Sequence, residues 1–342
     1  MNSRDEILLL LTGKSISRLP VFSGLPALTA SGLRATNIRY SDAHTNANKM
    51  ARAAASTFEI FGYESANVPF DLCVEAEALG CAIDFQTDVD AFLAPTVQIP
   101  ITNYEINFPD VTRAGRIPLV ADAVRELRRG IGKQIAIGAW MPGPFTLGWQ
   151  LFGADAWLAR VGQSPSTASS LRSEPAQDAL PLPALADFLA RVANFYYAAG
   201  ADFITVHEMG GSPQIIGPKH FRNLVKPALQ KLFAQMALPK ILSICGDTNA
   251  LVRDLAECGA DALNVDHRND LARTRRELPH AILLGNFDPV GLLSRGTPAQ
   301  IARAVEEIAQ AGADAVMPGC DLYPDIPDEN MRALMKSARH RT

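Results

Sequence analysis

Two cysteines with similar sequence surroundings are the residues of this chain best suited to chemistry. Cys245 follows an apolar run in Ile-Leu-Ser-Ile-Cys-Gly-Asp, and Cys320 follows another in Val-Met-Pro-Gly-Cys-Asp. A short apolar run of this kind is typical of a buried parallel strand that ends in a loop. Two thiols at two strand ends of one sheet can converge on a soft metal ion, with zinc as the first choice. A metal that keeps a thiol deprotonated at neutral pH creates a nucleophile, which indicates alkyl transfer.

The alternative interpretation is that these cysteines are small buried apolar residues, which is the commoner role of a cysteine at a strand end. Cys73, Cys81 and Cys258 fit that role, and Cys258 lies at the tail of a predicted helix. The chain has no Cys-x-x-Cys pair, so spacing alone gives no zinc motif. The metal interpretation therefore depends on where the fold places Cys245 and Cys320.

Composition limits the class of protein. The chain has 342 residues, a formal net charge of −4 and no basic block, so nucleic acid is not expected as the main partner. No apolar stretch approaches the roughly 20 residues of a membrane span, and the first residues indicate an amphipathic helix rather than a signal peptide. Five cysteines, an odd number, argue against a disulfide framework and favour a reducing, cytoplasmic location. The oligomeric state is left open.

The order of elements that must position the two cysteines can be read from apolar runs that alternate with helical patterns. Three helices lead into the next run through near-identical turns, which are Ala-Gly-Ala-Asp at 199–202 and 311–314 and Cys-Gly-Ala-Asp at 258–261. This repetition predicts an α/β fold, a single (β/α)8 TIM barrel over residues 1–342 with an N-terminal helical extension. The eight predicted strands are 19–23, 65–70, 134–141, 202–207, 240–245, 261–265, 281–285 and 314–319.

Two segments depart from the repeated pattern. Residues 85–118 are expected to form an extended excursion between the second and third strands, such as a small hairpin. Residues 162–182 are rich in serine, alanine and proline, which is typical of a loop that is either a lid or unstructured.

Polar residues gather where the predicted strands end, and a TIM barrel has its active site at that end. Individually, Asp71 could cap a helix, Asn286 could stabilise its loop and His207 could be a satisfied core histidine. In chain order the set is Asp71, Pro142, Gly143, His207, Glu208, Ser243, Cys245, Asp266, His267, Asn286, Asp288, Cys320 and Asp321.

A zinc site needs at least one ligand besides the two cysteines. Glu208 and His207 follow the strand next to the one that carries Cys245, so either side chain can reach the metal. Ser243 is a poorer ligand than imidazole or thiolate. The fourth position is expected to take the incoming thiol.

Several motifs occur in an order that resembles a known family. They are Val-Pro-Phe-Asp at 68–71, Cys-Gly at 245–246, Gly-Asn-Phe-Asp-Pro at 285–289, Pro-Gly-Cys at 318–320 and Pro-Asp-Glu-Asn-Met at 327–331. This succession resembles the uroporphyrinogen decarboxylase superfamily, in its corrinoid-dependent branch of methylcobamide:coenzyme M and chloromethane methyltransferases. The resemblance implies a zinc-dependent transfer of a methyl group between a corrinoid and a small thiol or another methyl donor or acceptor.

The chain departs from the branch at one metal ligand. The branch has His-x-Cys where this chain has Ser243 followed by Cys245, so the third ligand stays open between His207 and Glu208. The departure is also compatible with a changed methyl donor or acceptor, or with loss of the metal. Because no corrinoid-binding Asp-x-His-x-x-Gly segment is present, the resemblance implies that a partner protein carries the corrinoid.

The expected roles follow from this assignment. Glu208, Asp71 and Asn286 are expected to be catalytic, and Cys245, Cys320, Glu208 and His207 to be the candidate metal ligands. The residues expected to bind substrate are Asp71, Pro142, Gly143, Ser243, Asp266, Asn286 and Asp288. The alternative is a uroporphyrinogen decarboxylase-like lyase or a metal-free member, although the arginine-rich segment that clamps porphyrinogen carboxylates is missing after residues 19–22.

Overall fold

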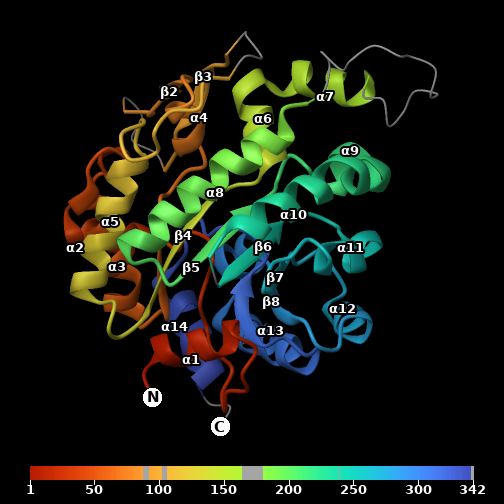
Figure 1. Ribbon diagram of the computed structural model, residues 1–342. Helices are drawn as coiled ribbons and strands as arrows, with labels where there is room; N and C mark the ends of the chain where they lie inside the picture. The colour runs from red at the N-terminus through yellow and green to blue at the C-terminus, as the bar shows by residue number, and fades with distance from the viewer. Residues whose placement is uncertain (88–91, 102–105, 164–179, 238, 340–342) are drawn as a thin grey trace.

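The fold is TIM-barrel-like, with a curled parallel sheet as its centre. The computed structural model describes all residues except 88–91, 102–105, 164–179, 238 and 340–342. Seven strands pair in parallel in the order β1-β4-β5-β6-β7-β8-β9 (Figure 1). They are β1 (Ser65–Val68), β4 (Ala136–Pro142), β5 (Phe203–His207), β6 (Lys240–Ile244), β7 (Ala262–Val265), β8 (Ile282–Phe287) and β9 (Ala315–Pro318). They correspond to seven of the eight predicted strands.

The prediction of a first strand over 19–23 is wrong. This segment makes only one β-bridge, between Val21 and Val316 of β9. On its other side the backbone makes one bond, from the Glu64 N–H to the Val21 carbonyl at 3.2 Å. Side chains take the N–H groups of the segment there, because the Val21 N–H donates to Glu64 Oε2 at 2.7 Å and the Ser23 N–H donates to Ser65 Oγ at 3.0 Å. Pro20 has no N–H to donate to a ladder. The segment thus lies between β9 and β1 without forming a strand.

The repeated helix-to-strand turns have the geometry that their sequence predicts. Gly200, Gly259 and Gly312 have φ angles of 113°, 96° and 90°, which place all three in the left-handed region. Glycine adopts this region without the steric cost that a Cβ brings. Each turn therefore ends one outer helix and returns the chain to the amino end of the sheet.

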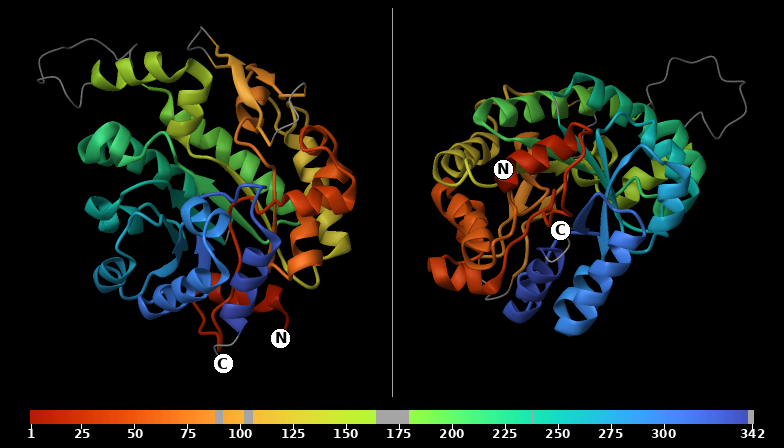
Figure 2. Two further views of the ribbon diagram at one scale, coloured as in Figure 1. Left: turned by 180° about the vertical axis from the view of Figure 1, so that it is seen from behind. Right: turned by 90° about the horizontal axis from the view of Figure 1, so that it is seen from below.

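Helices surround the sheet on its outer face (Figures 1 and 2). Their apolar sides pack on the strands, as the spacing of apolar residues predicts. The helices after β1 and β4 are α4 (Val74–Ala78), α5 (Ile117–Gly130), α6 (Pro144–Phe152), α7 (Ala154–Gln163) and α8 (Leu182–Ala199). Those after β5 and later strands are α9 (Pro213–His220), α10 (Lys226–Gln235), α11 (Val252–Ala256), α12 (Leu271–Glu277), α13 (Pro298–Gln310) and α14 (Asp328–Arg339). Shorter 3₁₀ or π turns are η1 (Ser41–His44), η2 (Phe221–Val225), η3 (Asn249–Leu251) and η4 (Pro289–Ser294).

The amino end of the sheet is covered by the first helix, α1 (Ser3–Leu11). Its buried Ile7, Leu10 and Leu11 join one apolar cluster with the inward-facing Phe203 and Leu284 of the strands. Figure 2 (right) shows α1 over this end of the sheet. The interior of the curled sheet is therefore filled at its amino end by apolar side chains. The space for a ligand lies at the carboxyl ends of the strands. Two further N-terminal helices, α2 (Ala30–Thr36) and α3 (Ala47–Phe61), precede β1.

The segment between β1 and β4 contains the antiparallel strands β2 (Ala82–Asp84) and β3 (Thr96–Ile99). This pair lies with α6 and α7 at the end of the molecule opposite α1 (Figure 1). Most of the predicted loop over 162–182 lies outside the described residues. In the part of the chain that the structure describes, no helix is both long and apolar enough to span a bilayer.

Candidate metal centre at the carboxyl end of the sheet

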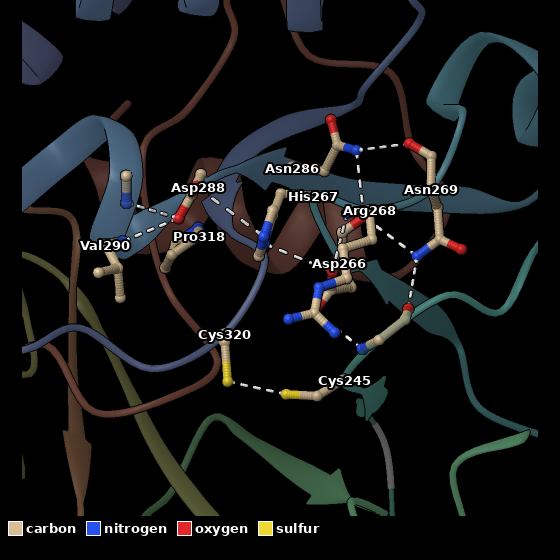
Figure 3. Close-up of polar contacts among 12 residues, drawn as sticks. Cys245, Asp266, His267, Arg268, Asn269, Asn286, Asp288, Val290, Pro318 and Cys320 are labelled. Atoms are coloured by element: carbon tan, nitrogen blue, oxygen red, sulfur yellow. Dashed lines mark hydrogen bonds and ion pairs between the residues drawn. The ribbon is translucent and has the colours of Figure 1, made fainter. Parts of the chain in front are cut away.

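The two cysteines singled out from the sequence lie next to each other. Cys245 follows β6 and Cys320 follows β9, and their Sγ atoms are 2.7 Å apart (Figure 3). Strands β7 and β8 separate β6 from β9, so the curl of the sheet brings the two loops together. Gly319 allows the approach, because a Cβ at this position would lie 2.5 Å from the backbone nitrogen of His267. The glycine of the Pro-Gly-Cys motif is therefore required because a side chain at this position would collide with the loop after β7.

His207, the last residue of β5, completes a group of three possible metal ligands. Its Nε2 is 3.5 Å from Cys245 Sγ, and the ligand atoms of His207, Cys245 and Cys320 all lie within 4.8 Å of one another. The imidazole is buried and the thiols are half-buried. Two thiolates and one imidazole nitrogen match the donor set that zinc prefers, with a fourth position left for a small ligand. The residues present therefore fit a zinc ion.

A chain of hydrogen bonds fixes which imidazole nitrogen faces the thiols. The Asn264 amide nitrogen donates to the Pro318 carbonyl at 3.0 Å, so its Oδ1 accepts the Ser243 hydroxyl at 2.8 Å. The Ser243 oxygen is then free to accept from His207 Nδ1–H, which lies at 3.0 Å. This assignment leaves the lone pair on Nε2, directed toward Cys245. Such an outer partner orients a histidine ligand and selects its tautomer.

Without a metal, the three groups share protons unequally. The hydrogen bond from Cys320 lowers the pKa of the Cys245 thiol to about 5, with help from His207 and against the effect of burial. That same hydrogen bond and burial raise the pKa of Cys320. Burial opposes the charged form of His207, yet the neighbouring Cys245 raises the pKa of its imidazole. Of the two thiols, Cys245 is therefore the one whose surroundings favour the thiolate.

Glu208 does not belong to this group of three. Its buried carboxylate accepts the N–H groups of Phe145 at 2.9 Å and Thr146 at 2.8 Å at the start of α6, and that of Gly211 at 3.2 Å. A Cβ on Gly143 would lie 2.2 Å from the Glu208 carboxylate, which explains glycine there. Glu208 and the Pro142–Gly143 turn thus hold the start of α6 against β5.

Asp71 is held by Arg116 and His44 in the mouth of the barrel. Arg116 donates to both carboxylate oxygens, at 2.8 and 3.0 Å, and His44 Nδ1 lies 2.9 Å from one of them. These partners hold the pKa of the buried Asp71 carboxyl well below its usual range, against the effect of burial. Asp71 also accepts the Cys73 N–H at 2.9 Å, which is the turn-capping role considered from the sequence.

Asp266 and Asn286 fasten neighbouring loops beside the thiols (Figure 3). The Asp266 carboxylate accepts the Gly246 N–H at 3.0 Å, and the Asn286 amide donates to the carbonyls of Asp266 at 3.2 Å and Asn269 at 3.1 Å. These bonds link the loops after β6, β7 and β8. They give both side chains a positioning role around Cys245.

Two cavities lie at the carboxyl end of the sheet, and one of them is lined by the thiols. The first, which we term the thiol cavity, has a volume of about 430 Å³ and is lined by both cysteines, Asp288 and Arg268. Asp288 caps η4 by accepting the N–H groups of Val290 and Gly291, each at 2.9 Å. The second, which we term the mouth cavity, has a volume of about 440 Å³ and is lined by Trp140, Trp149, Met209, Asp71 and Asp321, among others.

Several residues of the site were not expected from the sequence. Asn264 orients Ser243. The sequence feature that could have revealed this role is a polar residue inside the apolar run Ala-Leu-Asn-Val, because a buried amide needs hydrogen-bond partners. Arg116 forms an ion pair with Asp71 and His44 a hydrogen bond, and no sequence pattern connects these distant residues. Ser243 is buried beneath the imidazole and lines neither of the two cavities.

The chain belongs to the uroporphyrinogen decarboxylase (URO-D) family, whose pattern matches residues 2–341. It is 26% identical to the methylcobamide:CoM methyltransferase MtbA of Methanosarcina acetivorans, over 98% of this chain and 97% of that protein. It is 29% identical to MtaA of Methanosarcina barkeri, over 97% and 96% of the two chains. A methyltransferase from Methanosarcina mazei has a similar structure, with a TM-score of 0.90, 27% identity and 99% and 98% of the two chains covered.

These relatives confirm the family and the branch that the sequence motifs resemble. They also confirm the expected enzyme class, a methyltransferase.

The hydrogen-bond chain yields a prediction for Ser243. Ser243→Ala removes the acceptor for His207 Nδ1–H, so zinc affinity should fall by roughly 10- to 100-fold, as for other outer partners of metal ligands. Competition with a chromophoric chelator measures the change. Ser243→Thr keeps the hydroxyl and serves as the control; equal affinity in Ser243→Ala and the wild type would contradict the orienting role.

Proposed function

We propose that this protein moves a methyl group between a corrinoid, carried by a separate protein, and a small thiol, with zinc held by His207, Cys245 and Cys320. The convergence of these three ligand atoms within 4.8 Å is the observation that carries the proposal. The names of the relatives MtbA and MtaA support it, since both are methylcobamide:CoM methyltransferases.

The side chains divide the work in the proposed reaction. A bound zinc ion lowers the pKa of a thiol and keeps its sulfur anionic at neutral pH. Ser243 and Asn264 keep the Nε2 lone pair of His207 directed at the metal position. The loops fastened by Asp266 and Asn286 hold Cys245 in place. In the net reaction the thiol loses its proton and its sulfur gains the methyl group, while the bond from carbon to cobalt breaks and leaves its electron pair on cobalt.

The charges around the site favour methyl transfer over decarboxylation of a porphyrinogen. A substrate with many carboxylates needs several cationic side chains to bind it. Among the described residues that line the thiol and mouth cavities, Arg268 is the one arginine or lysine. The two paired cysteines also have no evident use in a decarboxylation without a metal, so the lyase and the metal-free alternatives both explain less of the site.

Substitution of the cysteines tests the proposal. Cys245→Ser and Cys320→Ser should each remove most of the bound zinc, because a neutral hydroxyl is a poor zinc ligand. Transfer of methyl groups from free methylcobalamin to thiols should fall with the metal content. Elemental analysis and the absorbance change of methylcobalamin measure both quantities, with Cys258→Ser as a control remote from the site. Full zinc and full activity in both variants would refute the metal centre.

Exposed apolar side chains around the barrel mouth support a protein partner there. Among the described residues, the exposed large apolar side chains other than Met1 are Phe92, Leu93, Met209, Ile215 and Tyr323. They lie on the β2–β3 connection and on the segments that follow β5 and β9, at the carboxyl end of the sheet. Exposed apolar groups that surround a cavity commonly mark a protein interface. A corrinoid protein that docks here would bring its cofactor over the thiols.

A charge placed among these exposed apolar residues, which we term the rim, should weaken binding of the corrinoid protein without changing the methyl transfer itself. Ile215→Glu should raise the KM for the methylated corrinoid protein several-fold, because a buried interface disfavours an unpaired carboxylate. Transfer from free methylcobalamin should stay unchanged. Gln310→Glu, at the end of α13, adds the same charge at the opposite end of the molecule and is the control. Equal KM values for the two variants would exclude this part of the rim from the interface.

A further inference from the structure

The mouth cavity has an unusual lining for a site that takes an anionic thiol. Its walls include the indole rings of Trp140 and Trp149 together with Phe70, Leu72 and Met209. No lysine, arginine or histidine is among the described residues that line it, whereas the carboxylates of Asp71 and Asp321 are. The cavity therefore combines aromatic and apolar surface with negative charge.

The two carboxylates differ in how far their charge is already balanced. Asp71 makes an ion pair with Arg116 and a hydrogen bond with His44, and all three groups are buried. For Asp321, the hydrogen bond found among the described residues is from the Cys320 thiol at 3.1 Å, and no ion pair of that residue occurs in this part of the chain. If Cys320 binds a metal as thiolate, this hydrogen bond is lost. Asp321 is then the carboxylate that can pair with a ligand.

Two residues that line the mouth cavity, Trp140 and Asp321, lie next to members of the group of three, which do not line it themselves. Asp321 directly follows Cys320, and the ring of Trp140 lies 5.5 Å from the ring of His207 between centroids. A short ligand whose sulfur reaches the group of three would thus have its other end among Trp140, Trp149 and Asp321. The Trp140 indole N–H is occupied by the Pro69 carbonyl at 2.8 Å, so the ring offers its apolar surface rather than a donor.

The thiol cavity does not offer a clear alternative for an anionic group. Arg268 and His267 line it, but so do Asp266 and Asp288. The two nitrogens of His267 lie 3.4 Å from an Asp266 oxygen and 3.9 Å from an Asp288 oxygen. The acidic groups thus balance the basic ones on that side.

We infer that the small thiol of the proposed function carries a cationic end, an ammonium or a quaternary ammonium group, which binds in the mouth cavity. A cation gains from the faces of indole rings and from the Asp321 carboxylate in a partly desolvated site. An anionic end, such as the sulfonate of the coenzyme M named for the relatives, would meet Asp321 without a cation from the described lining. The inference rests on the proposed function for the thiol but not for the binding of the cation.

Binding of simple ions tests the cavity without any methyl transfer. Isothermal titration calorimetry with choline and with ethanesulfonate, neither of which has a thiol, should show binding of choline alone. Asp321→Asn should weaken choline by roughly tenfold, the size of one partly buried charge pair. Asp325→Asn removes an exposed carboxylate of the same loop and is the matched control. Tighter binding of ethanesulfonate than of choline, or equal choline affinity in Asp321→Asn and wild type, would overturn the inference.

Thiols of matched size then test the acceptor. With free methylcobalamin, kcat/KM should fall in the order thiocholine, 2-mercaptoethanol, 2-mercaptoethanesulfonate, and Asp321→Asn should reduce the advantage of thiocholine. The best rate with the sulfonate would overturn the inference and leave the proposed function standing. Choline binding that depends on Asp321, without transfer to any thiol, would support the cation site and contradict the proposed methyl transfer.

Discussion

The hydrogen bond between His207 and Ser243 is the interaction on which the rest of the site depends. It fixes the imidazole so that its free lone pair faces Cys245, and it is itself fixed by the amide of Asn264. The three residues come from β5, β6 and β7, three neighbouring strands of the sheet. A hydrogen-bond chain across neighbouring strands is rigid because the backbone ladder holds each end, which suits the role of metal ligand that we propose for His207.

The same hydrogen-bond chain bears on the expected departure at Ser243. The branch that it resembles is expected to have histidine where this chain has Ser243. Here His207 lies directly opposite Ser243 in the parallel register of β5 and β6. An imidazole can therefore reach the same space from the adjacent strand, with the serine as its support rather than as its substitute. The proposed donor set is then two sulfurs and one nitrogen, with the nitrogen supplied by β5.

The sequence predicted the general arrangement because apolar runs and repeated glycine turns are local signals. Seven strands and the convergence of Cys245 and Cys320 followed from them. The failure at residues 19–23 has a local cause in Pro20 and a non-local one in the side chains of Glu64 and Ser65, which occupy the N–H groups of that segment. A contact with side chains that are distant in the sequence cannot be read from a local sequence pattern.

The choice between His207 and Glu208 shows the same limit. The two residues are neighbours at the end of β5, and successive side chains of a strand point to opposite faces. Sequence alone could not tell which of them faces the barrel. In the structure the N–H groups at the start of α6 bind the Glu208 carboxylate, so His207 is the residue that faces the thiols. Likewise, the pairing of Asp71 with Arg116 joins segments that no motif connects.

The most direct test of this account is X-ray absorption at the zinc edge on the wild-type protein and on His207→Ala, both purified without chelators. Zinc held by His207, Cys245 and Cys320 should show two sulfur neighbours at about 2.3 Å and one nitrogen neighbour with imidazole scattering. The imidazole signal should disappear in His207→Ala, while any zinc that remains keeps its sulfur neighbours. Imidazole scattering of equal strength in both proteins, or wild-type protein without zinc, would contradict the account.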